Sequence, residues 1–112
     1  MALQYLILSF GSGTVIQLTD IYFIKASENG VLIQLKDGKQ IKEWKSLTQI
    51  AQLLADQPDF FQVHRSYIVN KKYISVIRAN KLHLSDSHMI PIGITLKERV
   101  HQWVKHNKIE PK

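Results

Sequence analysis

The densest group of side chains able to bind an anion lies in residues 64–72, where His64-Arg65 and Lys71-Lys72 supply four cationic or hydrogen-bonding groups within nine residues. Such groups match phosphate oxygens and the acceptor atoms of nucleic-acid bases. Arg65 has no obvious acid partner nearby in the sequence, and its planar guanidinium fits a guanine edge or a phosphate, so we expect it to contact a nucleic acid. For His64 we expect a structural role, such as a hydrogen bond to a backbone carbonyl, and a Lys-Lys pair in a turn is often only solvated.

The charge distribution also favours a polyanionic partner. The chain has 112 residues and a formal net charge of +6. Residues 1–56 carry five lysines and five acids, whereas residues 57–112 carry ten Lys or Arg against four acids, together with all five histidines. The whole excess therefore lies in the second half, which predicts one basic face. Charge alone leaves a basic surface that serves only solubility equally open.

Residues for enzyme or metal chemistry are sparse. The sequence has no cysteine, which excludes disulfides, thiolate metal sites and cysteine nucleophiles and fits a reducing cytoplasm. It contains no Gly-rich phosphate loop, no G-x-S-x-G and no H-E-x-x-H. His83 and His88 flank a predicted turn without an evident third ligand, and His101 and His106 have the wrong spacing for one helical face. We therefore expect no enzyme activity, no metal and no cofactor.

Short runs rich in β-branched and aromatic residues, separated by turn signals, predict a mainly β protein. The turn signals include Gly11-Ser12-Gly13, Asn29-Gly30 and Asp37-Gly38. The first apolar run lacks a preceding Lys or Arg and ends at a glycine turn, so we interpret it as a strand and expect neither a signal peptide nor a membrane span. The expected strands are 3–10, 14–18, 21–26, 31–35, 40–44, 61–64, 66–69, 73–78, 81–84 and 89–92.

Two helices are expected from capping boxes, in which a Ser or Thr and a Glu or Gln three residues later cap each other's backbone amides. Ser46 and Gln49 predict a helix over 46–55, and Thr95 and Glu98 predict a final helix. The apolar faces are expected at Leu47, Ile50, Leu53 and Leu54 in the first helix and at Leu96, Val100, Trp103 and Val104 in the second.

The segment 60–74, Phe-Phe-Gln-Val-His-Arg-Ser-Tyr-Ile-Val-Asn-Lys-Lys-Tyr-Ile, resembles the core motif of the LytTR DNA-binding family. An early Asp-Ile and aromatic strand at 20–24 and a closing Pro-x-small strand at 91–93 extend the likeness over about 5–104. The resemblance implies a single domain over 1–112. Its implied fold is mainly β, with antiparallel β-sheets packed in an elongated sandwich, one internal helix and a C-terminal helix.

The resemblance also implies that loops, and not a recognition helix, read DNA. Carried onto this sequence, these loops are 27–30, 64–66 and 93–97. Family members usually carry arginine in the third loop, where this chain has Gly93-Ile94-Thr95, so Thr95 is expected mainly to cap the helix. Asn29 suits an adenine edge and a turn equally well. The candidate DNA-binding residues, including cations that would hold phosphates, are Asn29, His64, Arg65, Ser66, Asn70, Lys71, Lys72, Arg78, Thr95 and Lys97.

The function implied by the resemblance is sequence-specific binding of double-stranded DNA by a transcriptional regulator, the output domain of a bacterial two-component response regulator in the cytoplasm. Two copies are expected to act on promoter repeats, as a homodimer on DNA or through a receiver domain outside this sequence, because small modules bury limited surface. About five neutralised phosphates predict a log-log salt slope of roughly −4 to −5.

Two other functions remain open from the sequence. A β-rich RNA or single-strand binder also combines basic charge with aromatics, but it exposes them for stacking, whereas the LytTR interpretation predicts that Phe61, Tyr67, Trp44 and Trp103 are mostly buried. A LytTR-like protein-interaction domain that has lost its DNA contacts is suggested by the third loop alone.

Overall fold

The structure, a computed structural model, describes residues 5–7 and 15–105. Each predicted strand is present, and from residue 21 onward the boundaries agree to within two residues. The predicted ends of the first strand, at 3 and 10, and the expected turn at 11–13 lie outside the described residues. The strands are β1 (Tyr5–Ile7), β2 (Val15–Gln17), β3 (Ile21–Ser27), β4 (Gly30–Leu35), β5 (Gln40–Glu43), β6 (Phe60–His64), β7 (Tyr67–Asn70), β8 (Ile74–Arg78), β9 (Lys81–Leu84) and β10 (Met89–Pro91). The helices are α1 (Leu47–Leu53) and α2 (Lys97–Lys105), with 3-10 turns η1 (Leu18–Asp20), η2 (Lys71–Tyr73) and η3 (Ile94–Leu96).

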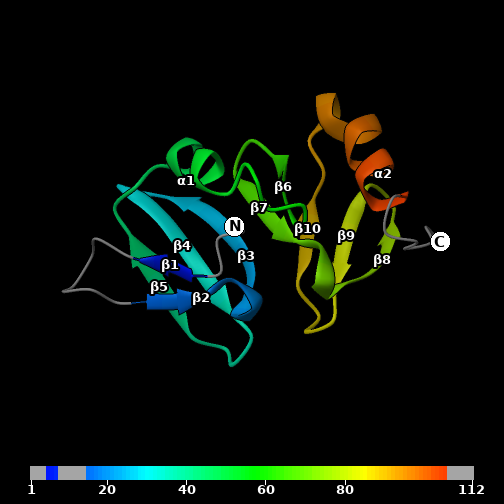
Figure 1. Cartoon of the computed structure of the whole chain (residues 1–112). Coiled ribbons are helices and arrows are strands. Elements are labelled where there is room, and N and C mark those ends of the chain that lie inside the picture. Colours follow the sequence, from blue (N-terminus) through cyan, green and yellow to red (C-terminus); the bar gives the residue numbers. More distant parts are fainter. Residues whose placement is uncertain (1–4, 8–14, 106–112) are drawn as a thin grey trace.

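The strands form three antiparallel sheets. Five strands pair in the order β5-β4-β3-β7-β6, three in the order β10-β9-β8, and β1 pairs with β2. Figure 1 shows the five-stranded sheet with α1 above it, and the three-stranded sheet beside it with α2 above. The molecule measures 43 × 31 × 25 Å. The predicted fold, antiparallel sheets in an elongated arrangement with two helices, is confirmed.

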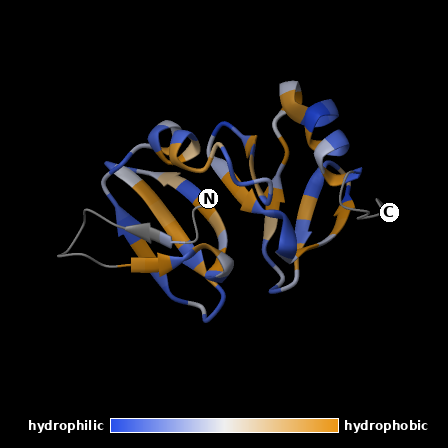
Figure 2. Cartoon of the chain, viewed as in Figure 1, coloured by the Kyte–Doolittle hydropathy of each residue, from blue (hydrophilic) through white to orange (hydrophobic). Residues whose placement is uncertain are grey.

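The core lies on both faces of the five-stranded sheet, because neighbouring strand residues point in opposite directions. Ile24 packs with Ile50 of α1 and with Ile16 of β2, whereas Phe23 packs with Leu82 of the second sheet and Val100 of α2. Figure 2 shows the resulting pattern, with apolar residues along the strands and hydrophilic residues at many of the connections. The central sheet is therefore held from two sides, which fixes the positions of its turns.

The two helices begin differently. The predicted capping box of α1 is confirmed, since Gln49 N donates to Ser46 Oγ at 3.1 Å and Ser46 N donates to Gln49 Oε1 at 2.9 Å. The box predicted at Thr95 is not formed, because η3 already turns at Ile94 and continues directly into α2. Thr95 is thus an exposed residue inside a turn, and its side chain makes no capping bond within the described chain.

Candidate nucleic-acid interface

Four connections meet at one end of the molecule. Ala26 N donates to Ser66 O at 2.8 Å, which joins the β3–β4 turn to the β6–β7 turn. Gly93 N donates to Val63 O at 2.7 Å, and Ile92 N donates to Asn80 O at 3.2 Å. We call this region, residues 27–30, 64–66, 78–81 and 93–97, the turn end; it faces upward in Figure 1. All three loops implied by the resemblance therefore lie together.

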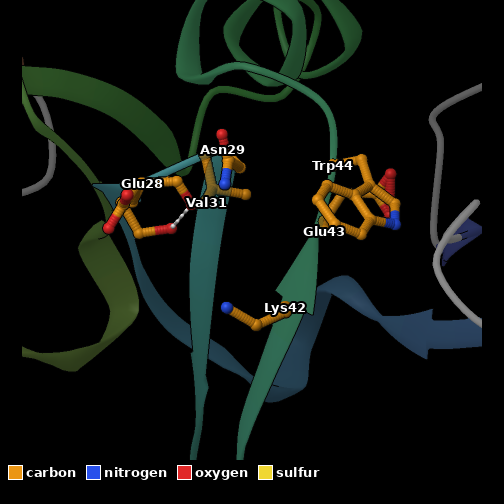
Figure 3. Close-up of a pocket in the computed structure, with 7 residues that line it drawn as sticks. Glu28, Asn29, Val31, Lys42, Glu43 and Trp44 are labelled. Carbon is orange, nitrogen blue, oxygen red and sulfur yellow. Dashed lines mark hydrogen bonds between the residues drawn. The ribbon is translucent and has the colours of Figure 1, made fainter.

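The β3–β4 turn places Asn29 at its tip in a left-handed backbone conformation. Asn29 has a φ of 65°, in the left-handed region that Asn tolerates better than most residues. Gly30 follows with a φ of 145°, and a Cβ added there would lie 2.1 Å from the carbonyl oxygen of Glu43. Figure 3 shows Asn29 at the tip, with Glu28 to one side and Lys42 of β5 below. The Asn29 side chain is exposed, so the turn role and a contact role are compatible.

In the β6–β7 turn, His64 bonds within the hairpin, whereas the neighbouring Arg65 faces solvent. Ser66 N donates to His64 Nδ1 at 3.1 Å, and the His64 ring meets Tyr67 edge-on with centroids 5.7 Å apart. His64 thus has a structural role in the hairpin, as expected, but its ring accepts from a backbone amide where a backbone carbonyl was the expected partner. Arg65 is exposed and lies within 4.0 Å of no acid among the described residues. The guanidinium is therefore available to an external anion, while Ser66 is half-buried.

The β8–β9 hairpin adds a second pair of cations to the turn end. Arg78 pairs with Lys81 across the two-residue turn, and both are exposed. The turn residues Ala79 and Asn80 have φ values of 51° and 61°, which matches the right-handed twist of the strands. Lys97 is half-buried at the start of α2, at the end of the third loop.

Asn70, Lys71 and Lys72 lie at the opposite end of β7, which corrects their place in the predicted set. Asn70 is 1% exposed, donates to Ile21 O at 2.9 Å and accepts from Lys72 N at 3.1 Å, so its amide joins two strands. Lys72 Nζ lies 3.9 Å from Asp59. We call this region, residues 18–20, 36–39, 58–59 and 70–73, the far end.

Lys71 is buried at the far end beneath α2. It is 5% exposed, and its Nζ lies 4.9 Å from the centroid of the Trp103 ring. Burial lowers the pKa of Lys71, and the negative charge of Asp59 opposes this shift. Trp103 in turn stacks on Phe61 at 5.2 Å and donates to Pro58 O at 3.0 Å. Lys71 therefore packs a helix against the sheet.

Most cations of the far end have an acid partner, whereas most cations of the turn end have none within the described ranges. At the far end, acids lie near three lysines: Lys36 at 3.2 Å, Lys39 at 3.8 Å and Lys72 at 3.9 Å. At or next to the turn end only Lys45 has an acid partner, Glu43 at 3.4 Å. The cations there that form no ion pair with any described acid are Lys25, Lys42, Arg65, Arg78, Lys81 and Lys97. These six cations at or beside the turn end are therefore not neutralised by any acid in the part of the chain that the structure describes.

Three of these cations were missed by sequence reasoning. Lys25 pairs with Leu32, and Leu32 pairs with Lys42, so both lysines share one face of the sheet just inside the turns. The sequence could have indicated Lys25 and Lys42, because both occupy polar positions in the apolar–polar alternation of strands close to the Asn29 turn. Lys81 could have been predicted as a candidate because it pairs with Arg78 across the two-residue turn.

The aromatic residues are arranged unevenly. Phe61, Tyr67 and Trp103 pack partly buried against the second core cluster, as predicted. The prediction for Trp44 is wrong, because this side chain is 59% exposed at the end of edge strand β5. An edge strand covers its side chains with one neighbour only, which sequence periodicity does not reveal.

The described residues hold no cluster of three or more His, Cys, Asp or Glu suited to a metal. His88 Nδ1 lies 2.6 Å from Asp86, and His101 Nδ1 lies 2.7 Å from Lys97 O. Neither described helix has the length and apolar character of a membrane crossing.

Comparison with known proteins gives one family and one fold. The family described as LytTr DNA-binding domain matches residues 12–105. A solved structure, the LytTr DNA-binding domain of a protein described as a methyl-accepting/DNA response regulator from Bacillus cereus, superposes with a TM-score of 0.74. The two sequences are 16% identical, and the match covers 92% of this chain and 98% of that one. No curated protein matches significantly.

Proposed function

We propose that this chain, which belongs to the LytTr DNA-binding domain family, binds double-stranded DNA sequence-specifically through its turn end. The observation that carries the proposal is the sorting of cations, with six unpaired at or beside the turn end and acid partners concentrated at the far end. Cations that no acid already neutralises contribute most to DNA affinity, because their binding to phosphates releases condensed counterions from the DNA. Residues at the tips of rigid hairpins can enter a groove, while lysines behind them hold the phosphates.

Within this proposal the side chains have separate roles. Arg65, at the tip of its turn, donates to a guanine edge or a phosphate, and Asn29 donates to and accepts from an adenine edge. Lys25, Lys42 and Arg78 supply the sequence-independent part of the affinity. His64 positions Arg65 through its bond to the Ser66 amide. Asn70 and Lys71 leave the proposed contact set because both are buried at the far end.

We further propose the cellular setting that the resemblance implied: a cytoplasmic output domain of a two-component response regulator that acts in two copies on promoter repeats. A module of this size buries a limited area on DNA, so two linked or adjacent copies raise the apparent affinity without new contacts. Sedimentation with duplexes that carry one or two selected sites tests this step. Two copies per two-site duplex, bound more tightly than the product of single-site affinities, are expected.

The primary test is selection of duplex DNA from a random pool, followed by competition. The enriched duplex should compete for binding far better than either of its single strands or the matching RNA. If one of the six cations contacts a base, about five neutralise phosphates, so a plot of log affinity against log salt concentration should have a slope of roughly −4 to −5. Equal competition by a single strand would favour the base-stacking function, which the exposed aromatic side chains of Trp44 and Tyr5 would support. A pool without enrichment would favour a protein-interaction domain.

A further inference from the structure

An apolar side chain protrudes from the middle of the cationic turn end. Ile94 is 85% exposed, whereas the other exposed large apolar side chains among the described residues are 46–59% exposed. Single apolar residues on a surface are ordinary and need no function. Ile94 differs in its location, since it occupies the third loop between Gly93 and Thr95, beside the unpaired cations. A solvated loop tip favours polar residues, so local preference does not explain it.

The backbone around Ile94 is anchored on both sides. Gly93 N donates to Val63 O at 2.7 Å, and Leu96 N donates to Gly93 O at 2.9 Å, which closes the 3-10 turn. Ile92 is 6% exposed, and Leu96 packs partly buried against the second core cluster. The flanking residues are therefore fixed in the core while Ile94 is held outward. Because Ile is also β-branched and has few χ1 rotamers, ordering it on a ligand costs little entropy.

The chemistry of the DNA grooves offers one match for such a side chain. The thymine C5-methyl group is the apolar feature that base pairs present in the major groove, and contact with it distinguishes A·T from G·C. Over a G·C pair, Ile94 would cover hydrogen-bonding atoms of guanine or cytosine without satisfying them, which is unfavourable. We propose that Ile94 contacts a thymine methyl group and is a specificity-determining residue for one A·T pair. This inference rests on the proposed function.

The test removes the methyl group alone. In the duplex enriched from the random pool, each thymidine is replaced in turn by deoxyuridine, which keeps the base pair and its hydrogen bonds. For the wild-type chain one replacement is expected to weaken binding about four-fold, the effect of exposing one methyl-sized group. Ile94→Ala is expected to bind the thymidine duplex more weakly and to show no difference between the two duplexes at that position. Leu53→Ala, which trims an exposed apolar residue on α1, is the matched control and should keep the full methyl effect.

The outcomes separate this inference from the function beneath it. Enrichment of a duplex in which no replacement changes the wild-type affinity would overturn the inference and leave DNA binding intact. A methyl effect that persists in Ile94→Ala would assign the contact to another residue and equally overturn it. A pool with no enriched duplex would remove the proposed function and the inference together. Circular dichroism melting of Ile94→Ala is expected to match the wild type, since the trimmed atoms are solvated.

Discussion

Arg65 and Lys71 are two cations of one sequence motif to which the structure gives opposite roles. We predict that Arg65→Ala weakens DNA binding and leaves folding unchanged, whereas Lys71→Met leaves DNA binding unchanged. Arg65 is exposed at the turn end, and Lys71 is 5% exposed beneath Trp103 at the far end. Methionine keeps an unbranched apolar stem of similar length and removes the ammonium group of Lys71.

The magnitudes follow from these surroundings. Loss of a base or phosphate contact by Arg65 costs about 1–3 kcal/mol, which lowers the affinity roughly 5- to 150-fold. If the lost contact is to a phosphate, the log-log salt slope also becomes shallower by about 0.9. Removal of an exposed side chain changes the free energy of unfolding by less than about 0.5 kcal/mol. For Lys71→Met, loss of the Trp103 contact and relief of the desolvation that lowers the Lys71 pKa oppose each other, so stability should change by about 1 kcal/mol at most.

The assay is fluorescence anisotropy of a labelled duplex between 50 and 200 mM salt, roughly the range over which phosphate contacts change affinity strongly. Lys39→Met, at the far end and next to Asp37, is the matched control for the loss of a surface charge. Urea unfolding of each variant reports the stability. Wild-type affinity and slope for Arg65→Ala, combined with a shallower slope for Lys71→Met, would refute the assignment of the two ends.

Further predictions concern single turns. Asn70→Ala should destabilise the fold by about 1–3 kcal/mol in urea unfolding, because it leaves the buried Ile21 carbonyl without its donor, while the DNA affinity of the folded fraction stays constant. Ala79→Gly should raise the free energy of unfolding by about 1 kcal/mol, since glycine adopts a φ of 51° without strain; an unchanged melting temperature would contradict this. Asn29→Gly keeps the left-handed turn and removes the amide, so it should lower affinity for the selected duplex more than for random duplex in the anisotropy assay. Glu28→Gln removes the acid at that tip and should strengthen binding to any duplex by about two-fold, because the carboxylate repels phosphates; unchanged affinity would show that Glu28 faces away from DNA.

The elements were predictable because their signals are local. Alternating apolar residues and turn dipeptides locate the strands, and the Ser46 box locates α1 without knowledge of the rest of the chain. The sequence also indicated that Arg65 has no acid partner, because no acid lies near it along the chain, and the structure leaves it exposed and unpaired among the described residues. Sequence reasoning also assigned His64 a structural role in its own turn.

The errors arose where the partner is distant in sequence. The acceptor for the Asn70 amide is Ile21, and the ring over Lys71 belongs to a helix near the end of the described chain. No local pattern reveals that a Lys-Lys turn lies under that helix. Lys25 and Lys42 required the strand register, which places them on one face across Leu32. Trp44 required knowledge of which strand forms the sheet edge.

The close approach of Gly30 to the carbonyl of Glu43 divides the β3–β4 hairpin into a part that can change and a part that cannot. Any side chain at Gly30 would push the hairpin off the neighbouring strand, whereas Glu28 and Asn29 meet solvent and carry little of the packing. Relatives of this chain are therefore expected to retain the glycine while the two residues before it diversify. Under the proposed function, the DNA sequence preference could then change at the tip without any change in the packed interior.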